Sequence, residues 1–218
     1  MKQSVKNLFA ILYIVFAVGV FAAVLIIEPS REIFKNLSSA HPYGMGFIKF
    51  ALLATAGELL AATIANKAPT VPVKVIWRFI IWGFIGIWIT FMMKVYSFAA
   101  SSLMQQSLLP GGNSVFLKAL YTSVMMNTSF GPTFMAVHKC TDKLLELKAA
   151  NKSAPLSAVI SGIDWTTFVR FTLFKTVPLF WIPAHTVTFL LPTEYQVMMA
   201  AALSVALGII LSVGKHKK

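Results

Sequence analysis

Long apolar runs alternate with short polar stretches along the whole chain of 218 residues. An α-helix rises about 1.5 Å per residue, so about 20 apolar residues cross the hydrocarbon core of a bilayer. Six segments meet this requirement, and we expect each to form a spanning helix. They cover residues 8–27, 45–65, 78–99, 115–137, 165–191 and 196–213. The pattern predicts an all-α fold, a polytopic transmembrane helix bundle in which residues 1–218 form a single integral membrane domain.

Lysine and arginine are unevenly distributed among the connections between these segments. The N-terminus, the 66–78 and 138–164 connections and the C-terminal tail carry twelve of them, whereas the other three connections carry two. Basic residues accumulate on the inner side of membrane proteins. The alternation therefore supports six spans and places both termini on the inner, positive side.

The composition agrees with a membrane protein. Hydrophobic residues make up 57% of the chain and charged residues 12%, against about 25% charged residues in a typical soluble domain. We attribute the net charge of +12 to inner loops that bind anionic lipid, and not to nucleic-acid binding. The apolar run near the N-terminus is longer than the roughly 7–15 residues of a signal peptide, so we interpret it as a retained helix.

Motifs for catalysis, nucleotide binding and metal binding are missing from the sequence. It has no P-loop, HExxH, GxSxG or Gly-rich dinucleotide motif. His138 and Cys140 lie two positions apart, but no second pair completes a zinc site. We therefore expect no enzyme, no cofactor and no metal.

Several charged residues fall inside the predicted spans. Lysine can extend to the interface when it lies near a helix end, as Lys49, Lys94 and Lys118 do. Glu58 and Lys175 lie deeper, and Glu58 falls between the depths of Arg170 and Lys175. Ionisable groups at such depth face a partner or a cavity, so we expect Glu58 to pair with Arg170 or Lys175. The pair could be purely structural, or it could belong to a polar lining whose surplus positive charge favours anions.

The fifth predicted segment also contains helix breakers. Pro178 and Pro183 each remove a backbone donor, and in lipid the carbonyl groups they free must be satisfied by protein or by water in a cavity. We therefore expect a kinked or locally unwound helix that faces the bundle interior. His185 follows this break and either packs and hydrogen-bonds or takes part in a gate or proton relay.

A second break is expected in the fourth predicted segment. Gly131 and Pro132 interrupt it, and Asn127, Thr128 and Ser129 can supply hydrogen bonds around the break.

Small residues recur every four positions in the last segment, at Ala200, Ser204, Gly208 and Ser212. Such a ridge allows two membrane helices to approach closely. It could serve packing within the chain or form the seam of a homo-oligomer.

Four sequence blocks resemble the family of the twenty-two-kilodalton peroxisomal membrane protein and the mitochondrial inner-membrane protein Mpv-seventeen. They are TAGELL (residues 55–60), GFIG (83–86) with Arg78 before it and Lys94 after it, FGP (130–132) and FWIPAHTVTFLLPTEYQ (180–196). The similarity spans about residues 50–213 and leaves out the first helix.

The chain departs from the family pattern at several positions, so no single motif is specific. Departures occur at Thr63-Ile64, Ile87, Met126-Asn127, Ile182, Thr188 and Gln196. The resemblance implies a small protein of a mitochondrial inner, peroxisomal or bacterial inner membrane. Family members are proposed to form small-solute channels or to support metabolite homeostasis.

These patterns lead to two functional hypotheses. The first is a channel or pore for small solutes with some anion preference, lined by Glu58, Arg170, Lys175 and His185. The second is a structural or assembly protein without transport activity, in which the inner basic loops and the last helix bind lipid or partner helices.

Overall fold

The computed structural model describes the backbone of residues 3–215 and the side chains of residues 4–210. The described residues are helical, with connecting loops and no β-strand, so the predicted all-α fold is confirmed. The helical elements are α1 (Gln3–Ile26), α2 (Glu28–Ala40), α3 (Pro42–Asn66), α4 (Val75–Gln105), α5 (Val115–Met125), η1 (Met126–Phe130), α6 (Gly131–Ala149), α7 (Leu156–Ser161), α8 (Trp165–Thr167), η2 (Phe168–Trp181), α9 (Ile182–Leu190) and α10 (Thr193–Lys215).

Four of the described helices are long and apolar enough to span a membrane. They are α1, α3, α4 and α10, and they coincide with the first, second, third and sixth predicted segments. These helices indicate a membrane protein, and no more than a third of the apolar window in α1, α4 and α10 is buried by the protein itself.

The fourth and fifth predicted segments are helical too, but each is divided by a π-helical stretch. The fourth runs through α5, η1 and α6, and the fifth through α8, η2 and α9. Six spans and the orientation of the termini stay predictions.

The helices form two compact units, and each is described by itself. Unit 1 contains residues 1–90 and 194–218, and unit 2 contains residues 91–193. The boundary falls inside α4.

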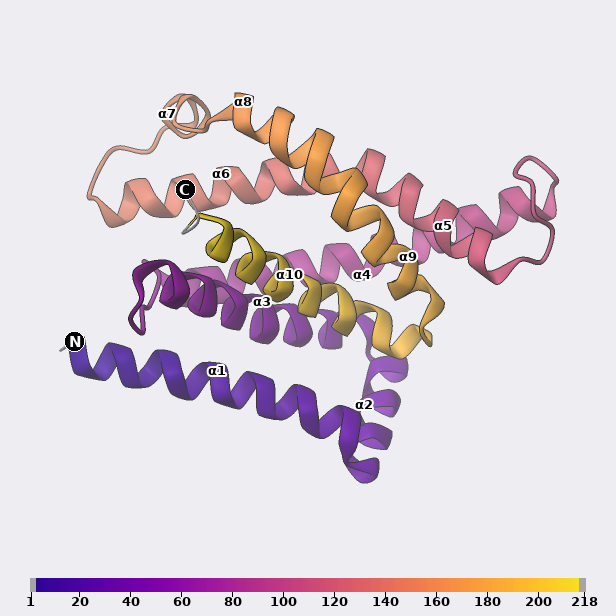
Figure 1. The fold of residues 1–218 in the computed structure, drawn as a ribbon, viewed down its shortest axis with the longest axis horizontal. Helices are drawn as coiled ribbons and strands as arrows, with labels where there is room; N and C mark the ends of the chain where they lie inside the picture. Colours follow the sequence, from indigo (N-terminus) through magenta and orange to yellow (C-terminus); the bar gives the residue numbers. More distant parts are fainter. Residues whose placement is uncertain (1–2, 216–218) are drawn as a thin grey trace. The chain divides into compact units, whose positions relative to one another are not determined.

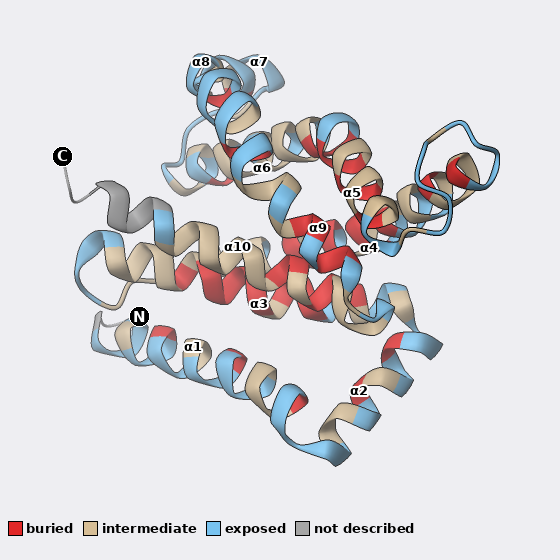
Figure 2. Cartoon of the chain, turned by 45° about the vertical axis from the view of Figure 1, so that its right-hand side comes forward, coloured by how far each residue is buried: buried red, intermediate tan, exposed pale blue. Residues whose placement is uncertain are grey.

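In unit 1, helices α1 and α3 pack against each other and α2 joins their ends (Figure 1). The Tyr13 hydroxyl lies 3.2 Å from the carbonyl oxygens of both Ala51 and Leu52, which links the middles of α1 and α3. Buried residues of unit 1 concentrate along α3, whereas much of α1 is exposed (Figure 2).

Glycines allow α3 to approach both α4 and α10. A Cβ on Gly86 would lie 2.7 Å from the Cβ of Phe50, and a Cβ on Gly46 would lie 2.9 Å from the Gly86 carbonyl oxygen. Further along α3, a Cβ on Gly57 would lie 3.1 Å from the Cα of Val205. Close backbone approach of this kind is typical of membrane helix pairs.

The sequence pattern does not predict helix α2, since residues 28–44 form a connection between the first two predicted segments. A proline in its first turn fits the start of the helix, and single residues separate α2 from α1 and from α3. Its Phe34 is buried and packs on Tyr195, with ring centroids 5.6 Å apart.

In unit 2, α5 packs along α9. Ser114 caps α5, because its hydroxyl accepts a hydrogen bond from the Leu117 amide at 3.3 Å. Asp164 caps α8 in the same way, through the Thr167 amide at 2.9 Å.

Candidate functional site

A buried polar cluster lies between α5–η1 and α9 in unit 2, and it consists of Ser123, Asn127 and His185. All three side chains are at most 8% exposed. The His185 Nδ1 atom lies 3.0 Å from the Asn127 amide nitrogen and 3.1 Å from its amide oxygen. The Asn127 amide donates to the Ser123 carbonyl at 2.8 Å, and the Ser123 hydroxyl donates to the Ile182 carbonyl at 2.7 Å.

Two aromatic rings lie beside His185. Trp181 and Phe189 lie one turn to either side of it on the same helical segment, with centroid distances of 5.1 and 6.5 Å. The imidazole is therefore held by Asn127 on one side and by aromatic packing on others. The described contacts of His185 are hydrogen bonding and aromatic packing, and its part in a gate or relay stays a prediction.

The local sequence explains the π-helical turn that carries Asn127. Pro132 lacks a backbone donor, and η1 ends directly before Gly131. Thr128 donates to the Val124 carbonyl at 2.8 Å, and Ser129 donates to the Met125 carbonyl. These hydrogen bonds confirm that the polar residues around the predicted break satisfy local backbone groups.

The break expected in the fifth segment takes the form of a π-helical stretch. Pro178 lies inside η2, and Pro183 lies in the first turn of α9. The segment is not unwound at the prolines, because π-helical and then α-helical structure continues from Phe168 to Leu190. Wide π turns often accompany functional sites in helices.

Within unit 1, Glu58 has a partner that the sequence did not predict, and its predicted pairing with Arg170 or Lys175, which belong to unit 2, stays a prediction. Arg170 and Lys175 are both exposed, and the cation beside Glu58 is Arg78, with its Nη1 3.1 Å from Glu58 Oε2. The indole nitrogen of Trp82 donates to Glu58 Oε1 at 2.8 Å. The side chains of Glu58 and Arg78 are 20% and 11% exposed, so this partly buried pair joins α3 to the start of α4.

Lys49 is a second charge inside the predicted spans of unit 1. It is 7% exposed, its ammonium donates to the Glu194 carbonyl at 3.0 Å, and it lies 4.4 Å from the centre of the Phe34 ring. The side chain therefore reaches from α3 toward α2 and the start of α10.

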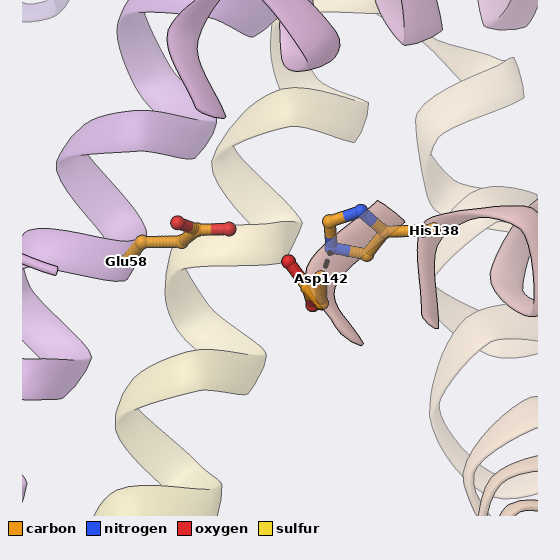
Figure 3. Close-up of side chains that lie close together, drawn as sticks. All are labelled: Glu58, His138 and Asp142. Atoms are coloured by element: carbon orange, nitrogen blue, oxygen red, sulfur yellow. Dashed lines mark ion pairs between the residues drawn. The ribbon is translucent and has the colours of Figure 1, made fainter. Parts of the chain in front are cut away.

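His138 and Cys140 are two positions apart on α6. The Nε2 atom of His138 lies 3.5 Å from Asp142 Oδ2, one turn further along this helix (Figure 3). Cys140 is half-buried.

The small-residue ridge of α10 packs within unit 1. Ala200 is buried, and Gly208 lies opposite Ala61 and Gly57 of α3, where a Cβ would meet atoms at 3.5 and 3.7 Å. Ser204 is half-buried, whereas the side chain of Ser212 lies outside the described residues. The ridge thus serves packing within the chain at Ala200 and Gly208.

Comparison of the chain with protein-family models, curated proteins and solved structures found no match.

Proposed function

We propose that the protein is an integral membrane protein that provides a passage for small polar solutes, with some preference for anions. The observation that supports this most directly is the buried cluster of Ser123, Asn127 and His185 in two predicted spans. Polar side chains inside a membrane are costly and usually face a bundle interior or a water-filled cavity. Irregular backbone at that depth is tolerated in the same places.

The proposed anion preference depends on Arg170 and Lys175. Both are exposed on η2, and in the described part of the chain no acidic side chain forms an ion pair with either. They lie five positions apart in a helix whose hydrogen bonds join residues five apart, so they emerge on roughly the same side. A cation facing lipid would be costly, so in the proposed protein this flank of η2 faces water.

The resemblance to the Mpv-seventeen family supports the same proposal, since members of that family are proposed to form small-solute channels. Its FGP and FWIPAHTVTFLLPTEYQ blocks fall on the η1–α6 junction and on the η2–α9 segment. A mitochondrial inner, peroxisomal or bacterial inner membrane would be the location.

Efflux from liposomes tests the proposal. Purified protein is reconstituted with trapped anions and cations of graded size, as the wild type and as Lys175→Leu, His185→Phe and the charge-preserving control Lys175→Arg. We expect size-limited efflux that favours anions, a lower anion-to-cation ratio in Lys175→Leu, and an unchanged ratio in Lys175→Arg.

Two results would contradict this proposal. Folded and inserted wild-type protein that releases nothing would favour the assembly role. Equal anion-to-cation ratios in Lys175→Leu and wild type would remove Lys175 from the lining. Circular dichroism and gel filtration in detergent confirm that each variant is folded before its efflux is compared.

A further inference from the structure

We infer that α2 is an interfacial helix that lies on the membrane surface, with one row of apolar side chains in contact with lipid acyl chains. This goes beyond the proposed solute passage and rests only on the membrane placement of α1 and α3. The inference is carried by the position of α2 in unit 1, by its contacts and by the pattern of exposure around it.

The position of α2 follows from its neighbours. A single residue separates α2 from α1, and another separates it from α3. Both neighbouring helices are long and apolar enough to span a membrane. A connection this short between two packed antiparallel spans must stay where they leave the hydrocarbon. Accordingly, α2 runs crosswise to α1 and α3 at their shared end (Figure 1).

Contacts within unit 1 hold α2 at that level. Phe34 is buried between the Lys49 ammonium and the Tyr195 ring. Lys49 also bonds to the Glu194 carbonyl, so the beginning of α10 lies at the same end of unit 1 as α2.

Residues four apart lie on one face of a helix, so the side chains of α2 form four rows. These rows face different surroundings. The inward row is Ser30, Phe34 and Ser38, which are half-buried or buried; the apolar row is Pro29, Ile33 and Leu37; the polar row is Glu28, Glu32 and Asn36; and the basic row is Arg31, Lys35 and Ser39. In the apolar row, Ile33 is 61% and Leu37 is 44% exposed.

An interfacial helix has this distribution. One face packs on its own protein, one apolar face enters the boundary between headgroups and acyl chains, and the polar face stays in water. Two acids and two bases leave α2 without net charge, and Glu32 pairs with Lys35 at 2.9 Å. The apolar row, and not attraction to anionic lipid, therefore provides the contact with the membrane.

Site-directed fluorescence on the full chain in vesicles tests the inference. In a Cys140→Ser background, single cysteines are introduced by Ile33→Cys and Leu37→Cys in the apolar row, by Asn36→Cys in the polar row and by Val15→Cys in α1. Val15 is 63% exposed near the middle of the candidate span, so it reports whether α1 is in the membrane. Each cysteine carries a small fluorophore that is quenched by brominated lipid or by aqueous iodide.

We expect brominated phosphatidylcholine to quench labels at 33 and 37 about threefold more than a label at 36, with the reverse order for iodide. Adding phosphatidylglycerol should leave these ratios unchanged.

Four results would overturn the inference. Labels at 33 and 37 could be quenched by lipid and iodide to the same extent as the label at 36 while lipid quenches the label at Val15→Cys. That result would place α2 in water. The labels at 33 and 37 could instead be shielded from both quenchers, which would mean that protein covers the row. Lipid quenching that appears only with phosphatidylglycerol would identify charge as the source of the contact. A label at Val15 that lipid does not reach would remove the membrane placement of α1, and with it the proposed solute passage.

Discussion

Replacing Gly86 by alanine tests the close crossing of α3 and α4. The added Cβ would lie 2.7 Å from the Phe50 Cβ and 2.9 Å from the Gly46 carbonyl carbon, and ordinary contacts of a Cβ begin at 3.4 Å. The Gly46 carbonyl carbon belongs to the backbone and the Phe50 Cβ is attached directly to it, so a side-chain rotation cannot relieve the overlap. The two helices must separate instead.

The magnitude follows from two opposing terms. Overpacking of this kind costs typically 1–3 kcal/mol, and backbone neighbours favour the upper end, about 3 kcal/mol. Alanine is better than glycine inside a helix by about 1 kcal/mol. We therefore expect Gly86→Ala to lower the free energy of unfolding by about 2 kcal/mol, which is roughly a 30-fold change in the folding equilibrium.

Gly19→Ala is the matched control, since it also lies inside an apolar helix but a Cβ there would meet no atom within 4 Å. The measurement is unfolding by dodecyl sulfate in mixed micelles, followed by circular dichroism. Gly86→Ala should unfold at a lower dodecyl sulfate fraction than wild type, and Gly19→Ala at an equal or higher one. If Gly86→Ala is as stable as wild type, the close crossing of α3 and α4 is refuted.

Two further predictions concern charged groups. Glu58→Gln should reduce the free energy of unfolding by about 1–3 kcal/mol, because it removes the carboxylate beside the partly buried Arg78. In a double-mutant cycle, Arg78→Met should cost less in the Glu58→Gln background than in the wild type, and additive losses would contradict the ion pair. Hydrogen bonds from Thr167 lower the pKa of Asp164. The stabilising contribution of this carboxylate is therefore complete above the pKa of an ordinary aspartate and is lost as the pH falls toward the lowered value. Asp164→Asn should weaken this acid dependence of unfolding, and an unchanged pH profile would contradict the prediction.

The positions of the helices could be predicted well from the sequence, because long apolar runs have few alternatives. Segments 45–65 and 78–99 fall within α3 and α4. Helix α2 could not be recognised by the same criterion, since it is short and polar on two sides. Its signal was the four-residue spacing of Pro29, Ile33 and Leu37 beside Glu28 and Glu32.

The partner of Glu58 was missed for a different reason. Depth along a span was used to match charges, but depth does not say which helices are neighbours or how they are rotated. Consecutive helices are usually adjacent in space, and Arg78 is the fourth residue of the helix that follows α3. Arg78 stands where the 66–78 connection meets the 78–99 segment, and the sequence does not indicate a partner for it there. The sequence identifies Asn127 and His185, but not the contact between them.

The charges inside the predicted spans fall into two groups that separate the functional hypotheses. Glu58 contacts Arg78 and Trp82 inside unit 1. Lys49 contacts Phe34 and the Glu194 carbonyl in the same unit. These contacts are sufficient for structural roles, so neither residue requires a passage. Arg170 and Lys175 differ because they are exposed on η2, in the fifth predicted segment. If the fifth predicted segment spans the membrane as proposed, these two cations face water or an anion beside η2, and Lys175→Leu is then a more discriminating substitution for transport than any change at Glu58.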